Sequence, residues 1–392
     1  MSALPRALSV SIRSALLCAG TAAVVPGAQA APAGGSVVAG QGSIGTPVVG
    51  TTVVNQQTQA LVVNWQSFDV AAGELVRFDQ PTASATALNR ILDHKASQVH
   101  GAIEANGRVF LVNTRGIFFG KTAQVNVGSL VASGLDITTE DFMAGRYEFD
   151  AAAGSGSVIN EGTITAATGG SVSLLGSGVS NSGLIVARYG RINLGSGQTA
   201  TLDFDGDGLI RFAVDGEVLG SGDGIEAAVD NSGTIQAHGG QVLLQGAAAK
   251  DVFTQVVNNS GVIGAQGIDT SGGSIRLVGG GSGGTVLNTG SLDASSLVAE
   301  GGFVELSASD MAVVAESGSI DVSSGAATGG EARVLGDNAG LFDTASVNAS
   351  GATGGGTVLV GGDFQGGNPE ISNATYAVVA SDAEILADAT GA

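Results

Sequence analysis

Four aspartates in one short segment are the best candidates for chemistry in this 392-residue chain. Asp203, Asp205 and Asp207 alternate with other residues, and Asp215 follows shortly after. Carboxylates on neighbouring coils of a β-helix can cleave polysaccharides. The first three, with Gly208, also have the spacing of the first oxygen ligands of an EF-type calcium loop. The segment therefore has three competing interpretations, which are glycan cleavage, a calcium site and a solvated hairpin turn.

Both chemical interpretations lack a partner residue. Position twelve of the calcium loop is Val214, where a bidentate glutamate is needed, and no flanking helices are evident. The histidines, His94, His100 and His238, belong to no His-Glu-x-x-His motif, and no Gly-x-Ser-x-Gly elbow stands between a strand and a helix. We therefore expect no enzyme, no metal and no cofactor, with His94 and His100 as surface or turn residues.

The charge balance and composition restrict the partner and the fold class. The formal charge is −20, and the only lysines are Lys95, Lys121 and Lys250. Binding to a phosphate backbone needs clustered cations, so we expect no nucleic-acid partner. The 65 glycines accompany 43% hydrophobic residues. These are mostly small or β-branched and lie in short alternating runs, a pattern that favours thin, regular β layers over a bulky core.

The first thirty residues have the pattern of a targeting segment. Arg6 and Arg13 precede an apolar run, which ends in a small-x-small cleavage pattern at Ala30. We predict a secretory signal over residues 1–30. The only cysteine, Cys18, lies inside it and follows a leucine, where lipidation needs a small residue. The mature chain would have no thiol, which suits passage through a second membrane as an unfolded thread.

The segment from 64 to 136 holds the only tryptophan and most of the non-repetitive sequence. Short alternating runs with Gly, Pro or Asn between them predict strands there. The expected strands include residues 101–103, 108–112, 117–119 and 124–127. Within Ser84–Leu92, the apolar residues Ala87, Leu88 and Ile91 have helical spacing, which predicts a short helix or a buried loop. Residues 140–147 form the other expected short helix.

Repeats begin after Asp150. An Asn-x-Gly motif recurs at Asn160, Asn181, Asn231, Asn259 and Asn288, with Glu316-Ser-Gly318 as a degenerate copy. The last four of these six positions are separated by 28, 29 and 28 residues, by subtraction of their numbers. Such a period with short strands and no helix predicts a parallel β-solenoid. The asparagines could form a ladder of stacked amides or ordinary β-turns, and the sequence does not choose between them.

Two further features modify the solenoid. The longer interval between Asn181 and Asn231 contains apolar runs around an Asp-Gly turn over Thr201–Asp215, which predicts a hairpin that projects from the solenoid. Residues 383–392 match the start of another repeat unit. We therefore expect the chain to be a fragment of a longer protein.

The motifs of the leading segment, in this order, carry a family resemblance. They are Trp65-Gln-Ser-Phe-Asp-Val70, Phe78-x-Gln80-Pro81, Ala87-Leu-Asn-Arg-Ile-Leu92, Asn106-Gly-Arg-Val-Phe-Leu-Val-Asn113, Gly116-Ile-Phe-Phe-Gly-Lys121 and Val127-Gly-Ser-Leu-Val-Ala-Ser133. Residues 37–142 resemble the N-terminal secretion domain of two-partner-secretion exoproteins of the filamentous haemagglutinin and high-molecular-weight adhesin type. One departure is Asn113-Thr-Arg-Gly116 in place of Asn-Pro-Asn-Gly, in which Arg115 replaces a residue that tolerates left-handed geometry.

The resemblance implies an all-β, right-handed parallel β-helix with an N-terminal cap and extra-helical hairpins. It implies residues 31–150 as a secretion domain that caps the helix and residues 151–392 as its repeats. The partner would be an outer-membrane Omp85-type transporter of a Gram-negative bacterium, whose periplasmic domains bind the unfolded leading region. The exoprotein would then be secreted or reach the cell surface, fold there and serve adhesion through a host receptor. Matching motifs make Trp65, Arg90, Asn106, Asn113 and Gly116 the candidates for recognition or capping.

Two other functions remain open at this point. A β-helical polysaccharide-active enzyme would use the aspartates of the 203–215 segment. An autotransporter passenger would continue into a membrane barrel on the same chain. The sequence names no receptor and no individual transporter.

Overall fold

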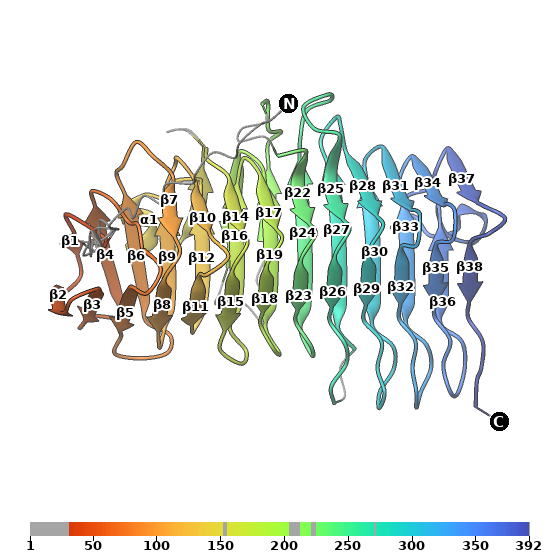
Figure 1. Ribbon diagram of the computed structural model, residues 1–392. Helices are drawn as coiled ribbons and strands as arrows, with labels where there is room; N and C mark the ends of the chain where they lie inside the picture. The colour runs from red at the N-terminus through yellow and green to blue at the C-terminus, as the bar shows by residue number, and fades with distance from the viewer. Residues whose placement is uncertain (1–30, 152–154, 204–211, 221–224, 270–271, 392) are drawn as a thin grey trace, which may run out of the picture.

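The computed structural model describes residues 31–151, 155–203, 212–220, 225–269 and 272–391. Strands of this part stack into one elongated solenoid with three long faces (Figure 1). From β7 on, each coil contributes one strand to each face, and each strand pairs in parallel with its equivalent in the next coil, as β23 does with β26. The expected parallel β-helix is confirmed.

The strands fall into three long sheets, here called the first, second and third sheets. The first contains β1 (Ser36–Ala39), β4 (Ala60–Trp65), β6 (Thr86–Ile91), β9 (Arg108–Val112), β12 (Ser129–Ser133), β16 (Ser171–Gly176), β19 (Arg191–Ser196), β24 (Gln241–Ala247), β27 (Ser274–Gly280), β30 (Phe303–Ala308), β33 (Glu331–Leu335) and β36 (Thr357–Val360). The second contains β2 (Gly42–Val48), β3 (Thr51–Gln56), β5 (Leu75–Asp79), β8 (Ala102–Ala105), β11 (Gln124–Val127), β15 (Thr163–Ala166), β18 (Leu184–Val186), β23 (Thr234–Gln236), β26 (Val262–Gly264), β29 (Ser291–Asp293), β32 (Ser319–Asp321), β35 (Ser346–Asn348) and β38 (Glu384–Leu386). The third contains β7 (Ser97–Val99), β10 (Ile117–Phe119), β14 (Val158–Asn160), β17 (Val179–Asn181), β22 (Ala227–Asn231), β25 (Gln255–Asn259), β28 (Thr285–Asn288), β31 (Met311–Val314), β34 (Asn338–Leu341) and β37 (Tyr376–Val379).

The interior of the solenoid is a continuous apolar column. Equivalent positions of successive coils carry Ile185, Ile235 and Ile263, which lie in register and are fully buried. A single coil leaves these side chains open on two sides, so the coils stabilise one another by stacking. The first sheet pairs β12 directly with β16, so the stack continues past residue 150. The division into a 31–150 secretion domain and later repeats stays a prediction.

An antiparallel cap closes the N-terminal end. Strand β1 pairs antiparallel with β4 in the first sheet, and β2 pairs antiparallel with β3 in the second. Residues 31–68 contain no Asp, Glu, Lys, Arg or His. The open edge of β2 therefore has no charged side chains to prevent pairing with another chain. It is protected by Pro47 and by the irregular register between Gly45 and Val48.

The prediction of a short helix or a buried loop within Ser84–Leu92 is wrong, because residues 86–91 form the strand β6. Ala87 and Ile91 face the interior of the solenoid, whereas Leu88 packs into a second apolar cluster on the outside of the first sheet. A strand buried on both faces loses the polar alternation that identifies strands. The other expected helix exists as α1 (Thr139–Met143), but it ends before Tyr147, which begins the strand β13 (Tyr147–Asp150). A short 3₁₀ turn spans Phe364–Gly366.

The repeated asparagines form a ladder. Nδ2 of Asn160, Asn181, Asn231 and Asn259 donates to Oδ1 of the next asparagine, and the four distances, in order, are 2.8, 2.7, 2.7 and 2.7 Å. All five side chains are buried, and Asn160 also binds Gly162 at its own corner. Asn288 pairs with Val314 of the next coil, so the degenerate copy at Glu316 stays outside the ladder. The ladder interpretation is therefore correct.

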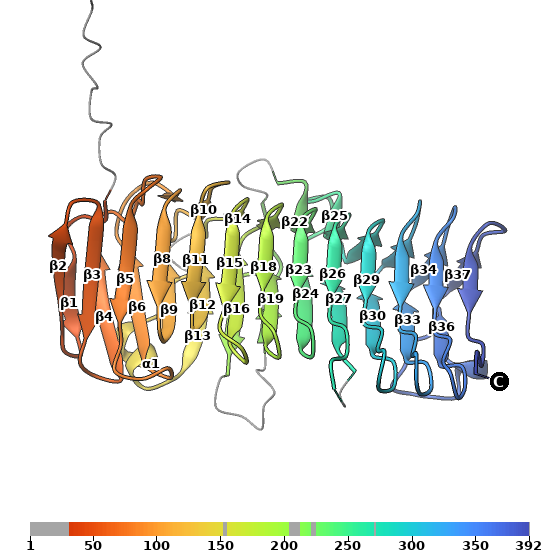
Figure 2. The ribbon, with the colours of Figure 1, turned by 60° about the horizontal axis from the view of Figure 1, so that its bottom comes forward.

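A small antiparallel sheet covers part of the outside of the first sheet. Strand β13 (Tyr147–Asp150) pairs with β20 (Thr199–Leu202), which pairs with β21 (Phe212–Asp215). These strands and α1 are called the flap below, and Figure 2 shows α1 and β13 beside β6, β9 and β12. The predicted hairpin exists as β20 and β21, but β20 pairs with β13, and the hairpin does not project freely. In the described ranges, no helix has the length and hydrophobicity to cross a membrane.

Candidate functional site

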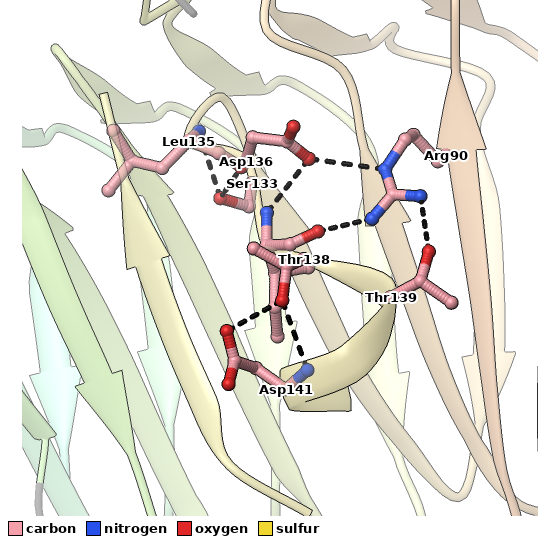
Figure 3. Close-up of polar contacts among 8 residues, drawn as sticks. Arg90, Ser133, Leu135, Asp136, Thr138, Thr139 and Asp141 are labelled. Atoms are coloured by element: carbon pink, nitrogen blue, oxygen red, sulfur yellow. Dashed lines mark hydrogen bonds and ion pairs between the residues drawn. The ribbon is translucent and has the colours of Figure 1, made fainter. Parts of the chain in front are cut away.

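Arg90 connects the first sheet to the start of the flap. Its side chain leaves the outer face of β6 and donates from Nε to Asp136 Oδ1 at 3.2 Å and from Nη1 to Thr139 Oγ1 at 2.9 Å. Nη2 donates to the backbone carbonyl of Ile137. Figure 3 shows the Arg90 side chain beside Asp136 and Thr139. The Arg90 side chain is only 16% exposed, while that of Asp136 is 37% exposed. Arg90 therefore holds residues 136–139 against the sheet in the folded protein.

The segment held by Arg90 leads directly into α1. Asp136 exchanges two backbone hydrogen bonds with Asp150, which closes the base of the flap. Thr138 is the N-cap of α1, because its Oγ1 accepts from the backbone N–H of Asp141 at 3.0 Å. The hydroxyl of Thr138 also donates to the carboxylate of Asp141 (Figure 3), and this bond, followed by the one from Arg146, lowers the pKa of Asp141.

Asn113 and Gly116 form a tight turn at the end of β9. Oδ1 of Asn113 accepts from the backbone N–H of Arg115, and the Asn113 carbonyl accepts from Gly116 N–H at 2.8 Å. Nδ2 of Asn113, which is 1% exposed, donates to the Lys95 carbonyl and to Ser97 Oγ. Gly116 has φ +106°, whereas Arg115 keeps a negative φ. The arginine thus does not occupy the left-handed position, and the turn forms without the proline of the family motif.

Arg90 and this turn border the same small hollow. It has a volume of about 240 Å³ and is lined by Arg90, Ile91, Leu92, Asp93, His94, Val112, Thr114, Arg115 and Asp136. Arg115 is exposed, and no ion pair joins it to another described residue. His94 is exposed, and His100 is half-buried and packs edge-to-face against Phe118, as expected of surface and turn residues. Of the five candidates, Arg90 lines the hollow itself, while Asn113 and Gly116 form the turn that places Thr114 and Arg115 in its wall.

Trp65 and Asn106 lie elsewhere and belong to internal networks. Trp65 is 1% exposed and donates from Nε1 to Asn89 Oδ1 at 3.0 Å. Asn106 is exposed, but its amide exchanges two hydrogen bonds with the backbone of Gln80, and Gln80 donates to the buried Gln56. These three residues form a hydrogen-bond network at the corner between the second and first sheets, in which only Gln80 and Gln56 join through their side-chain amides. Trp65 and Asn106 therefore stabilise the first coils.

The carboxylate segment gathers no site in the described residues. Asp203 follows β20, while Asp205 and Asp207 lie outside the described residues. Val214 packs into the apolar cluster beneath the flap, so the twelfth position of the calcium loop points away from solvent. No group of three His, Cys, Asp or Glu residues in the described ranges is arranged to hold a metal.

Three partners of the candidates were not predicted from the sequence. Asp136 and Asn89 are polar residues in apolar runs, a pattern that could have suggested buried partners for Arg90 and Trp65. Gln80 was noted only as part of a motif, and its hydrogen bond to Gln56 was not predicted. The distances between these residues along the chain carry no signal that pairs them.

Comparisons with known proteins agree with the geometry. A family model described as TPS secretion domain matches residues 28–294. Two heme/hemopexin-binding proteins of Haemophilus influenzae are 30% identical over 224 residues and 32% identical over 109 residues. The first match covers 55% of this chain and 24% of the relative, and the second covers 28% and 12%. The chain thus spans about a quarter or less of the length of these relatives.

A solved structure has the same fold. The crystal structure of the HMW1 secretion domain from Haemophilus influenzae matches with a TM-score of 0.69 and 24% identity. The match covers 91% of this chain and 100% of that chain. At this identity the likeness supports the β-helical fold alone.

Proposed function

The chain belongs to the TPS secretion domain family of two-partner-secretion exoproteins, and from this premise we propose that its leading region is read by the transporter as an unfolded segment. Members of the family are secreted and have a cognate transporter; they are not an enzyme family. For this chain, the signal of residues 1–30 first directs the protein to the periplasm. The periplasmic domains of the transporter then bind residues 37–142 before these residues fold.

The burial of the candidate residues supports the proposal that the transporter binds them before the chain folds. Trp65 and Asn113 are each 1% exposed, and Gly116 lies against the backbone of Ser157. Arg90 uses three donors within the fold. A partner that reads these groups reaches them only in the unfolded chain, because folding withdraws them from solvent. Folding outside the cell then removes the recognition segment and releases the exoprotein.

The proposal assigns the folded protein a role at the surface. Residues 31–150 form the secretion domain that caps the stack, and residues 151–392 form β-helical repeats. Adhesion to a host receptor is the activity proposed for the whole exoprotein. The binding of heme or hemopexin is stated for the relatives, of which this chain covers 24% or less, and no geometry described here favours it.

Export of a deletion variant tests the proposal. The full chain and a chain without residues 37–142 are expressed with the transporter gene, and each is measured in the medium and in the periplasm. We expect the full chain in the medium only when the transporter is present and the deleted chain in the periplasm in both cases. Release of the deleted chain at the normal level would reject the proposal. A substitution at exposed Tyr376, on β37 and outside residues 37–142, is the control and should not change release.

A further inference from the structure

The flap joins segments that lie far apart in the chain. Tyr147 of β13 pairs with Leu202 of β20, and Asp150 pairs with Thr199. Ala200 of β20 then pairs with Val214 of β21. Strand β13 follows the leading region, but the strands that complete its sheet come after two further coils, β14 to β16 and β17 to β19. The flap therefore cannot form until the chain beyond residue 199 is available.

The flap covers an apolar surface that the first coils create. Phe110, on the outer face of β9, lies 5.2 Å from the ring of Phe142 and 5.1 Å from that of Tyr147. Leu202 and Val214 are 2% and 8% exposed and belong to the same cluster. Without β20 and β21, this cluster lacks three of its buried side chains, which are Ala200, Leu202 and Val214. Removing apolar area from water is the main driving force for closing the flap.

The contacts of Arg90 are independent of those later strands. Its partners, Asp136, Ile137 and Thr139, follow β12 directly and are present as soon as the first coils have formed. They fix the direction in which the chain leaves β12, and with it the start of α1 and β13. The first part of the flap is thus positioned before its strand partners arrive.

We infer that the flap closes as a late step, after residues 199–215 have left the transporter, and that Arg90 is the positioning residue that holds its base in place for that step. The statement about the transporter rests on the proposed function. The folding order itself is a property of the chain and needs no transporter. The leading region is therefore complete only when the hairpin of β20 and β21 has docked.

Hydrogen exchange during refolding of the mature chain, residues 31–392, tests the inference. Pulse labelling after dilution from denaturant should protect β9 and β12 first. Residues 147–150 should become protected later and together with residues 199–202 and 212–215. Protection of residues 147–150 as early as that of β9, ahead of 199–202, would overturn the inference.

Variants of the full chain test the role of Arg90. Arg90→Met should raise the exchange rate of residues 136–150 in the folded protein roughly tenfold or more, because three hydrogen bonds to a charged group are lost. Arg90→Lys should recover part of the protection. Arg333→Met, which removes an ion-paired arginine from the outer face of β33, is the matched control and should leave residues 136–150 unchanged. Equal exchange in Arg90→Met and the unsubstituted chain would contradict the positioning role.

Thr201→Pro tests the dependence on β20 without burying a charge, because Thr201 is exposed and pairs with Glu148. Exchange at β28 to β33 reports whether the rest of the solenoid is intact. We expect residues 147–150 to lose protection while β28 to β33 keep theirs. Unchanged protection of residues 147–150 would overturn the inference. If the variant failed to fold, the refolding order of the unsubstituted chain would decide. The measurements use no transporter, so their failure is separate from a failure of the export experiment.

Discussion

Asn181 and Asn231 are fifty residues apart in the sequence, yet Nδ2 of the first donates to Oδ1 of the second at 2.7 Å. The interval between them contains the hairpin of β20 and β21. Strand β17 nevertheless pairs with β22 in register, with Val179 opposite Val229. The additional residues between the two asparagines are therefore accommodated outside the solenoid, and the asparagine ladder continues without interruption.

Substitution inside the ladder should cost more than the loss of one hydrogen bond. Asn231→Leu leaves Nδ2 of Asn181 and Oδ1 of Asn259 buried without a partner. We expect the free energy of unfolding to fall by about 1 to 3 kcal/mol, measured by urea titration. Asn126→Leu, at an exposed position of β11, should change it by less than about 0.5 kcal/mol. Equal effects of the two substitutions would contradict the ladder.

Trp65→Phe should destabilise the cap. The substitution leaves Asn89 Oδ1 buried without its donor and creates a cavity beside Phe68 and Gly35, both of which lie against the indole ring. The expected loss in unfolding free energy is about 1 to 3 kcal/mol, measured by urea titration. Tyr376→Phe, at a side chain that is 68% exposed, is the control and should have no measurable effect. A neutral Trp65→Phe would show that the indole hydrogen bond contributes nothing.

Gly116→Ala should disturb the turn beside Arg90. Gly116 has φ +106°, and a β-carbon there would lie 2.7 Å from the carbonyl oxygen of Ser157. The expected loss of stability is about 1 to 3 kcal/mol, with a lower midpoint of thermal unfolding. Gly45 lies outside the left-handed φ region and has open space around it, so Gly45→Ala should be neutral or slightly stabilising. A stable Gly116→Ala variant would mean that the turn relaxes more readily than the packing indicates.

Asp230→Asn should stabilise the protein at neutral pH. Burial raises the pKa of the Asp230 carboxyl, the hydrogen bond from Asn258 opposes this, and the charge of Glu226 raises it further. A folded pKa above the unfolded one means that the charged carboxylate destabilises the fold. This penalty is complete above the folded pKa, shrinks as the pH falls through it, and is absent below the ordinary value of 3.8. The stabilisation by Asp230→Asn should follow the same course in urea titrations at several pH values, and a gain that persists below 3.8 would refute this origin.

The parallel solenoid was predictable because its signals repeat. The periodic Asn-x-Gly corners set the coil length, and the strands at 108–112, 117–119 and 124–127 were placed correctly. Strand β6 was not, because the flap buries its outer face at Leu88 and removes the alternation. The flap depends on the pairing of β13 with β20, and this pairing leaves no local pattern in the sequence of either strand.

The candidate site was predictable only in part. Motif matching found Arg90, which lines the hollow, and Asn113 and Gly116, which form the turn whose residues Thr114 and Arg115 line it. It could not distinguish an exposed recognition surface from buried support, because the same residue types serve both. Asn113 and Trp65 prove to be buried, and this depends on Ser97 and Asn89, whose proximity is a property of coil stacking.

Binding to the transporter's periplasmic domains tests the central claim most directly. The mature chain is diluted from denaturant into a solution of these domains, and binding is compared with that of the same chain after folding, with fluorescence of the single Trp65 reporting its burial. The account predicts that the freshly diluted chain binds and that binding disappears as Trp65 becomes buried. Equal or tighter binding by the fully folded chain would contradict it.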